Sequence, residues 1–203
     1  MSEKPKYSFK CLENECPQRA CCTREPVTVT LGDIVRWNEQ DYLSHIVPGV
    51  VIQMPESDTD ALILVTARRQ LKKDASKTAC VFYHEESNAC SIRYARPISC
   101  RTFPLQFAGE NFVLSNKECS GIGKGEVARD ALKEARNTAE LEFKERLETE
   151  KTLPGLYTVF MSLMLRQSAE AMKDLSDEDR KRIDEIMSRR SSSEEGQGAE
   201  SGD

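Results

Sequence analysis

The chain has 203 residues, which fits one ordinary domain, and 38 % of them are hydrophobic, enough for a modest core. The 34 Asp and Glu residues outnumber the 29 Lys and Arg residues, which gives a formal net charge of −5. Because a phosphate backbone rewards an excess of basic residues, this balance argues against a nucleic-acid-binding protein. The eight cysteines make up about 4 % of the chain, below the roughly 8–10 % typical of small disulfide-stapled proteins.

The N-terminal sequence and the short apolar runs predict a cytoplasmic protein. The first residues, MSEKPKYSFKC, include no apolar signal-peptide core. The two longest apolar runs, 61–65 and 156–165, are far shorter than the ~20 residues that span a bilayer, so no membrane partner is expected. Because cytosolic thiols stay reduced, the cysteines favour metal binding or catalysis over disulfides.

Residues 1–125 predict a cysteine-rich domain with short strands. A helix is expected from Thr30 to about Leu43, since Thr30 and Asp33 have the spacing of a capping box. The predicted strands share β-branched, aliphatic or aromatic residues between turns, and they cover residues 27–30, 61–66, 80–83 and 111–115.

Residues 126–190 predict a helical extension. Apolar residues recur at spacings of three and four between 128 and 147, which is the pattern of a helix with one apolar face. Pro154 and Gly155 are expected to end that helix, and a second, more apolar helix is expected after them. We expect these C-terminal helices to offer a surface for a protein partner. Residues 191–203 have no apolar side chain larger than alanine and predict a disordered acidic tail.

The cysteine spacing carries the functional signal. All eight precede residue 120, and four of them lie between residues 11 and 22. Four clustered and four dispersed thiols suit one or two centres with four thiolate ligands each. Soft thiolates select zinc, iron–sulfur clusters or Cu(I), and the loose spacing favours an iron–sulfur cluster, of the [4Fe–4S] type, over zinc. The candidate metal ligands are Cys11, Cys16, Cys21, Cys22, Cys80, Cys90, Cys100 and Cys119.

Other interpretations of the cysteines are open at this point. An even number allows four disulfides, which the lack of a secretion signal disfavours, and one or two cysteines could be buried free thiols. Cys21 and Cys22 are expected to point apart on an extended backbone, so they need not bind the same metal. His45 and His84 are additional candidate ligands, because imidazole suits both zinc and iron, or they are ordinary surface or core histidines.

Arginines and prolines surround Cys100. Pro97 and Pro104 fix the backbone on either side of it. The neighbouring Arg96 and Arg101 would favour a deprotonated thiolate. We predict that both arginines bind a cofactor, by donating to cluster sulfurs or by pairing with a substrate carboxylate. The alternative is that each caps a turn or pairs with an acidic side chain.

The run Ser120–Gly125 is rich in glycine and precedes the predicted helical extension. It lacks the order of residues that a phosphate-binding loop requires, so nucleotide binding is not expected. We predict instead that these glycines let the backbone approach a metal centre bound by Cys119.

Together these motifs resemble the YkgJ-type cysteine-cluster family of zinc- or iron-chelating domains, over about residues 8–125. The resemblance implies a metal centre, an iron–sulfur cluster or zinc, held by the matching cysteines. The family is similar to the flagellin lysine N-methylases, whose proposed chemistry uses such a cluster with S-adenosylmethionine. The opening motif is looser here, Cx4Cx4CC in place of CxxCxxCC. The motifs that carry the resemblance are Phe9-Lys-Cys11, Cys21-Cys22, Val27 to Ile34, Cys80-Val-Phe, Cys90-Ser-Ile, Tyr94 to Pro104 and Cys119-x-Gly-x-Gly.

The predicted fold class is α+β, a small metal-nucleated domain with short strands followed by the helical extension and the tail. Three functions fit this sequence. The first is a metal-binding protein that carries an iron–sulfur cluster or zinc in a redox-related role. The second is a cluster-dependent enzyme resembling a protein-lysine N-methylase, and the third is a structural zinc module for protein–protein interaction. Whether the chain is an enzyme stays open.

Overall fold

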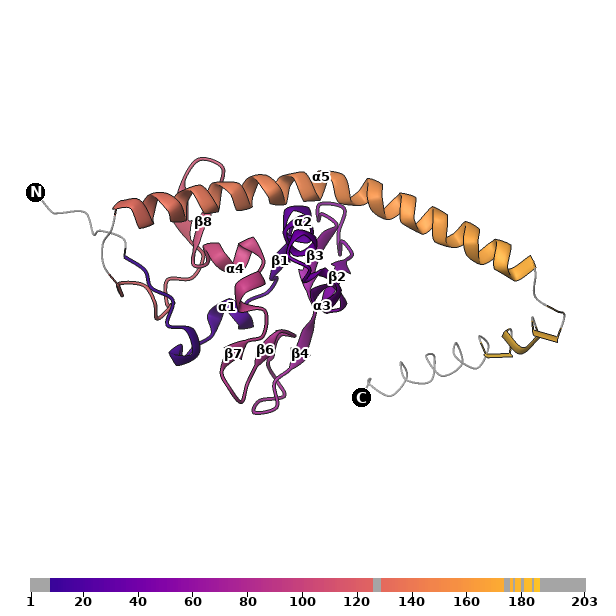
Figure 1. Cartoon of the computed structure of the whole chain (residues 1–203), viewed down its shortest axis with the longest axis horizontal. Coiled ribbons are helices and arrows are strands. Elements are labelled where there is room, and N and C mark those ends of the chain that lie inside the picture. The colour runs from indigo at the N-terminus through magenta and orange to yellow at the C-terminus, as the bar shows by residue number, and fades with distance from the viewer. Residues whose placement is uncertain are drawn as a thin grey trace, which may run out of the picture. The chain divides into compact units, whose positions relative to one another are not determined.

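The computed structural model contains both strands and helices, so the predicted α+β fold class is confirmed (Figure 1). The chain divides into two compact units, Met1–Pro154 and Gly155–Asp203. The predicted acidic tail at 191–203 lies outside the described residues, as does Ala128 of the predicted helix. The residues that the structure describes are 8–125, 129–173, 176, 178–179, 181–183 and 185–186.

A three-stranded antiparallel sheet lies in the first unit. Its middle strand is β3 (Ile63–Thr66), flanked by β1 (Thr28–Val29) and β2 (Val50–Gln53). Aliphatic and β-branched residues make up β3, and three of its four residues are buried. The strand predicted at 61–66 is therefore confirmed as the buried centre of this sheet.

Three hairpins complete the β structure. Two of them end on a cysteine, with Cys80 opposite Arg68 and Cys90 opposite Tyr83. The predicted run at 80–83 divides between two of these hairpins. The pairs are β4 (Arg68–Gln70) with β5 (Thr78–Cys80), β6 (Tyr83–His84) with β7 (Ala89–Cys90), and β8 (Leu105–Phe107) with β9 (Phe112–Leu114).

Helix α2 (Leu31–Glu39) begins with the predicted capping box. Thr30 Oγ1 accepts a hydrogen bond from the Asp33 backbone N–H at 3.0 Å, and Asp33 Oδ2 accepts one from the Thr30 backbone N–H at 3.0 Å. The helix ends before the predicted Leu43, because the chain turns at Asp41 with φ 59°. The short helices are η1 (Glu13–Glu15), α1 (Ala20–Thr23), α3 (Leu43–Ile46), η2 (Val47–Gly49), η3 (Arg93–Ala95) and α4 (Ile98–Thr102).

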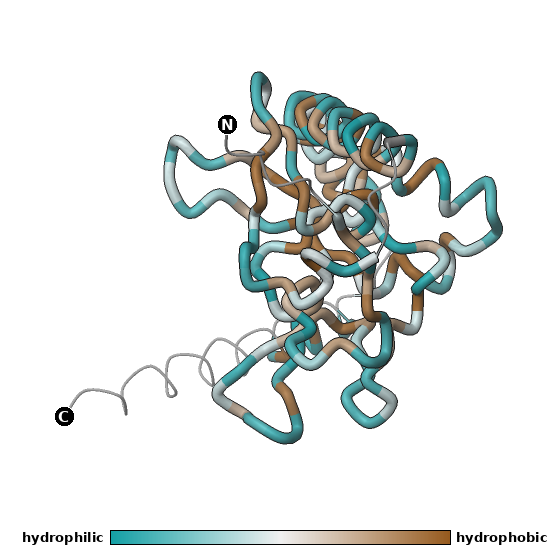
Figure 2. Tube along the Cα trace, turned by 90° about the vertical axis from the view of Figure 1, so that its left-hand side faces the viewer, coloured by the Kyte–Doolittle hydropathy of each residue, from teal (hydrophilic) through white to brown (hydrophobic). Residues whose placement is uncertain are grey.

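The core of the first unit lies where α2, α4 and the sheet meet. The residues Val27, Trp37, Ile46 and Ile98 are each 1 % exposed. In Figure 2 the loops that project from this unit are largely hydrophilic, whereas the segments that meet inside it are hydrophobic. Burial of these side chains is the main favourable contribution to the stability of the unit.

Helix α5 (Arg129–Lys173) continues through Pro154, so the predicted helix end at Pro154 and Gly155 is wrong. A proline inside a helix removes one backbone donor and crowds the preceding turn, but the turns on either side keep their own hydrogen bonds. Pro154 does coincide with a boundary, because it is the last residue of the first compact unit.

The first half of α5 belongs to the first unit and packs on the rest of it through the predicted apolar face. Ala139 is fully buried, and the Phe143 ring meets the Phe107 ring edge-on with their centroids 5.5 Å apart. Thr149 Oγ1 accepts a hydrogen bond from the Leu31 backbone N–H at 2.9 Å, which satisfies a free donor at the start of α2. Figure 1 shows this half of α5 above α2, α4 and β8.

An ion-pair network joins α5 to α2. Both carboxylate oxygens of Glu145 accept from the Arg36 guanidinium, at 2.6 and 2.8 Å, and one also accepts from Thr30 Oγ1 at 2.7 Å. Burial raises the pKa of Glu145, but the hydrogen bonds from Arg36 and Thr30 outweigh it and hold this pKa below its usual value. Ionised Glu145 therefore stabilises the fold above about pH 4.5. This contribution declines as the pH falls through the lower folded-state pKa.

We expect Glu145→Gln to lower the free energy of unfolding by about 1–3 kcal/mol at pH 7, because it weakens a charge-assisted pair. Urea unfolding at pH 7 and pH 3 measures this loss, and the difference between the two proteins should shrink at the lower pH. The buried neighbour Glu142, whose pKa is raised by burial, is present in both wild type and Glu145→Gln. Its contribution therefore cancels when the two proteins are compared. A difference that stays constant between the two pH values would contradict the assigned role.

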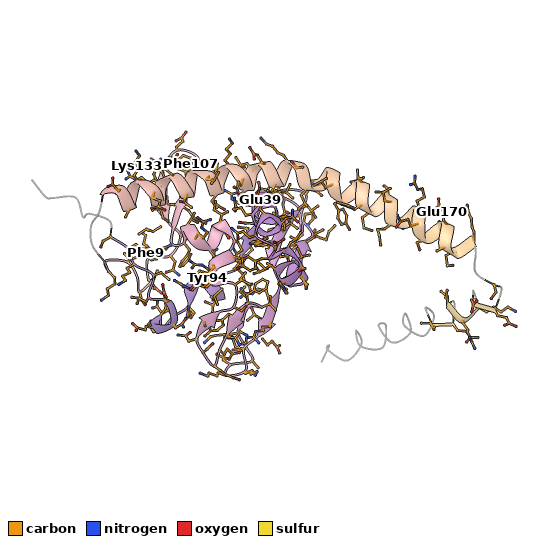
Figure 3. The ribbon with its side chains drawn as sticks, in the orientation of Figure 1. Phe9, Glu39, Tyr94, Phe107, Lys133 and Glu170 are labelled. Atoms are coloured by element: carbon orange, nitrogen blue, oxygen red, sulfur yellow. The ribbon has the colours of Figure 1, made fainter. Side chains whose placement is uncertain are left out.

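Residues 155–173 of α5 expose large apolar side chains within the second unit. Figure 3 shows side chains projecting from this part of the helix, where Glu170 is labelled. None of the helices in the described part of the chain has the length and apolar character needed to cross a membrane. The protein partner expected for this surface stays a prediction. The exposed apolar residues are Leu156, Val159, Phe160, Met161, Leu163, Met164, Leu165 and Met172.

Candidate metal centre

Five of the eight cysteines line one cavity of about 60 Å³ in the first unit. They come from three separate parts of the chain. The N-terminal segment up to α1 supplies three, α4 supplies one, and the loop after β9 supplies the last. Other cavity-lining side chains include Phe9, Arg19 and Phe103. The five cysteines are Cys11, Cys16, Cys21, Cys100 and Cys119.

A backbone bridge brings the first and last cysteines of the chain together. Phe9 pairs with Ile122 in an isolated antiparallel bridge, and the Lys10 backbone N–H donates to the Gly121 carbonyl at 3.1 Å. A Cβ built on Gly121 would lie 2.5 Å from the Lys10 carbonyl oxygen, so only glycine permits this approach. Gly121 therefore lets the backbone of Phe9 and Lys10 approach, while the predicted approach of the glycine run to a metal centre stays a prediction.

We expect Gly121→Ala to separate this bridge and to cost about 1–3 kcal/mol of unfolding free energy, as overpacking does. It should also lower metal content, because it moves Cys11 away from Cys119. Gly123→Ala is the matched control for crowding, since no atom lies within 4 Å of a Cβ at Gly123, although its φ of 76° adds backbone strain. Equal metal content in wild type and Gly121→Ala would contradict the proposed role of the bridge.

Cys21 and Cys22 lie on helix α1, and their Sγ atoms are 3.8 Å apart. The prediction that they point apart was wrong because the backbone here is helical rather than extended. The Arg68 guanidinium from β4 donates to the Thr23 and Arg24 carbonyls at 3.0 and 2.7 Å, which satisfies the end of this short helix.

The two neighbouring thiols differ in acidity. Hydrogen bonding from Cys22 lowers the pKa of Cys21 to about 6, against the opposing effect of burial and with help from the positive charge of Arg19, Arg24 and Arg96. The pKa of Cys22 is raised, because it donates to Cys21 and is buried. The lowered pKa of Cys21 favours its thiolate, the form that binds metals.

The three cysteines that do not line the cavity, Cys22, Cys80 and Cys90, form a second group with Cys100, which does line it. Cys22 interacts electrostatically with Cys90 and Cys100, and Cys80 interacts with both Cys90 and Cys100. Burial raises the pKa of Cys100 to about 11 and also raises the pKa of Cys90.

The other group of cysteines lines the cavity. Its member Cys119 interacts electrostatically with Cys11, Cys16 and Cys21. Burial raises the pKa of Cys119 as well. Cys21 belongs to both neighbourhoods, since its charge also acts on Cys90 and Cys100. The eight candidate ligands thus form two groups that share electrostatic contacts through Cys21. Cys11, Cys16 and Cys119 interact in one group, and Cys22, Cys80, Cys90 and Cys100 interact in the other.

Two arginines that the sequence analysis missed accompany the predicted Arg96 and Arg101. Arg24 Nη2 lies 3.8 Å from Cys100 Sγ and donates to the Ser99 carbonyl at 2.9 Å. Arg19 is 5 % exposed and lines the cavity, as do Arg96 and Arg101. Arg19 and Arg24 each lie two residues from the Cys21-Cys22 pair in sequence. A basic residue close to a cysteine in sequence is also the pattern that identified Arg96 and Arg101 near Cys100.

Other predicted donors lie elsewhere. His45 and His84 are exposed, and neither lines the cysteine cavity. The eight cysteines are free thiols rather than disulfides. Among the residues that the structure describes, no three His, Cys, Asp or Glu side chains are close enough together to hold a metal ion.

The cysteine-rich region matches a known protein family. Residues 10–120 match the CxxCxxCC family, whose description is "Putative zinc- or iron-chelating domain". The chain belongs to this family. No curated protein and no solved structure matches the chain. All eight cysteines lie within the matched residues of the CxxCxxCC domain, so the family resemblance expected from the sequence is confirmed and metal binding by this domain is supported.

The donor set of the CxxCxxCC domain fits a soft metal, because every candidate ligand is a thiol. The surroundings fit as well. Arg24 Nε is buried and has no hydrogen-bond partner among the described residues, while the same guanidinium approaches Cys100. Such a donor would be satisfied by a negatively charged sulfur centre beside it.

Proposed function

We propose that the CxxCxxCC domain is a metal-binding domain that holds an iron–sulfur cluster on its cavity cysteines. The observation that carries the proposal is that five thiols from three chain segments line one cavity of about 60 Å³. About 10–15 Å³ is enough for one water molecule, so the cavity has room for more than one atom. A single ion needs less space than this, which favours a group of several atoms.

Electrostatics support the same proposal. Four thiolates around an iron–sulfur cluster leave an excess of negative charge in a partly buried place. Arg19, Arg24 and Arg96 all act on Cys21, and their positive charges would offset that excess. Such a cluster supplies one-electron transfer, so the proposed role is redox-related.

The ligand assignment follows the two cysteine neighbourhoods. Four of the five cavity cysteines, Cys11, Cys16, Cys21 and Cys119, would supply the four thiolates of one centre, and Cys100 is assigned to the other. The second group would supply another four, which makes two centres the upper limit for eight cysteines. Its members are Cys22, Cys80, Cys90 and Cys100.

Zinc is the second candidate, and one distance favours it. Two thiolates bound to one tetrahedral zinc at about 2.3 Å are separated by about 3.8 Å. The Sγ atoms of Cys21 and Cys22 show this separation. In this case the domain would be a structural module with Cys21 and Cys22 on the same ion.

Absorption and electron paramagnetic resonance spectra distinguish the two candidates on protein purified without oxygen. An iron–sulfur cluster predicts a broad band near ~400 nm that bleaches on reduction with dithionite and a paramagnetic signal in one oxidation state. Zinc predicts a colourless protein with neither feature. A colourless protein with stoichiometric zinc would overturn the proposed cluster.

A further inference from the structure

A second cavity of about 300 Å³ lies next to the cysteine cavity, between α4, β8 and the first turns of α5. The side chains of Phe9, Arg96 and Arg101 line both cavities and so form the wall between them. In Figure 3 Phe9 lies below the part of α5 that carries Lys133. The second cavity is wholly contained in the first compact unit.

The charged groups of this second cavity are two arginines and one acid. Arg96 Nε donates to the Arg93 carbonyl at 3.0 Å, which fixes one edge of its guanidinium. Within the described residues, neither Arg96 nor Arg101 forms an ion pair, although Glu134 lines the same cavity. The cavity lining therefore keeps one net positive charge and two guanidinium groups with donors to offer.

The rest of the lining is partly apolar. Phe9, Leu105 and Ala135 provide hydrocarbon surface beside the two guanidinium groups. Ligand sites combine such a surface with a few polar groups that fix orientation. A guanidinium matches a carboxylate especially well, because its parallel N–H groups bind both carboxylate oxygens.

We propose that this second cavity binds a small carboxylate whose carboxylate group pairs with Arg96 and Arg101. The hydrocarbon part of the ligand packs against Phe9, Leu105 and Ala135. The single negative charge of such a ligand balances the net charge of the lining. This site goes beyond the metal centre and requires neither iron nor zinc in particular, but it places a small molecule one side-chain layer from the thiols.

Isothermal titration calorimetry with sodium butyrate tests the proposal on the full chain as purified, with its metal. We expect saturable binding to the wild type, and about tenfold or greater weakening in Arg96→Gln and in Arg101→Gln, since each removes a charge-assisted pair. Arg136→Gln is the matched control. Arg136 is an arginine next to the cavity residue Ala135 in sequence, but it stacks on Phe112 and does not line the cavity. Butylamine, of similar length and opposite charge, should not bind.

A second variant keeps the test independent of the arginines. Ala135→Leu fills the cavity and should block butyrate while leaving both guanidinium groups in place. No saturable butyrate binding to the wild type, or undiminished binding to Arg101→Gln and Ala135→Leu, would overturn the proposal. Tighter binding of inorganic phosphate than of butyrate would overturn the carboxylate assignment. Metal content, measured on the same samples, reports separately on the metal centre.

Discussion

Cys21→Ser is expected to abolish the cavity centre, which lowers the metal content of the purified protein by at least about tenfold with one centre and by about half with two. Cys21 contributes to both cysteine neighbourhoods and is the thiol with the lowered pKa, about 6. Its loss should also lower the melting temperature, because metal binding adds to the free energy of folding. Elemental analysis and thermal unfolding of the same preparation measure both effects.

His84→Ala is the control for this substitution. His84 is exposed on β6 and lies outside the cysteine cavity, so its replacement should leave metal content unchanged. Cys119→Ser and Cys90→Ser then separate the two neighbourhoods. With two centres, each should remove about half of the metal, whereas with one centre in the cavity only Cys119→Ser should remove it. Full metal content in Cys21→Ser would show that the ligand assignment is wrong.

Asp33→Ala is expected to destabilise the first unit by about 3–5 kcal/mol, the cost of breaking a buried charged network. Asp33 is 1 % exposed and its carboxylate accepts three hydrogen bonds from other residues. Two come from the backbone N–H groups of Thr30 at 3.0 Å and Ile98 at 2.9 Å, and one comes from Arg36 at 2.7 Å. The substitution leaves both buried N–H groups without their acceptor.

The same residue connects the core to the cysteine region. Ile98 begins α4, which carries Cys100, so loss of the Asp33–Ile98 hydrogen bond should also loosen one wall of the cavity. Glu39→Ala is the matched control, an acidic residue on the same helix but exposed, and should change stability by no more than about 0.5 kcal/mol. Chemical denaturation gives both values. A loss below about 1 kcal/mol for Asp33→Ala would contradict the network.

Local sequence patterns predicted the elements whose stability depends on neighbours in the chain. The capping box at Thr30 and Asp33 and the apolar face of α5 were predicted from residue spacing, and the buried strand at 61–66 from its run of aliphatic and β-branched residues. The continuation of α5 through Pro154 was not predicted, because helix termination depends on whether the following turns can continue despite one missing hydrogen bond. The early end of α2 follows from the left-handed turn at Asp41, for which the residue type gave only a weak signal.

The sequence was sufficient to list candidate ligands but not to predict how the structure arranges them. Thiol chemistry and spacing identified the candidate ligands, whereas their grouping depends on contacts between distant segments. The Phe9–Ile122 bridge that joins Cys11 to Cys119 is one such contact. The backbone conformation at Cys21 and Cys22 also could not be predicted. Adjacent side chains point in opposite directions on an extended chain, but they lie only about 100° apart around a helix. The second cavity at Arg96 and Arg101 requires α5 to pack beside α4, which no local pattern specifies.

The proposed iron–sulfur centre is tested most directly by the amount of iron, zinc and acid-labile sulfide per chain, on protein purified without oxygen. We expect iron with a matching amount of sulfide, about four of each for one [4Fe–4S] centre or about eight for two. Zinc without sulfide would contradict the iron–sulfur assignment and leave a structural metal domain. A chain with neither metal would contradict metal binding by the cysteine cavity altogether.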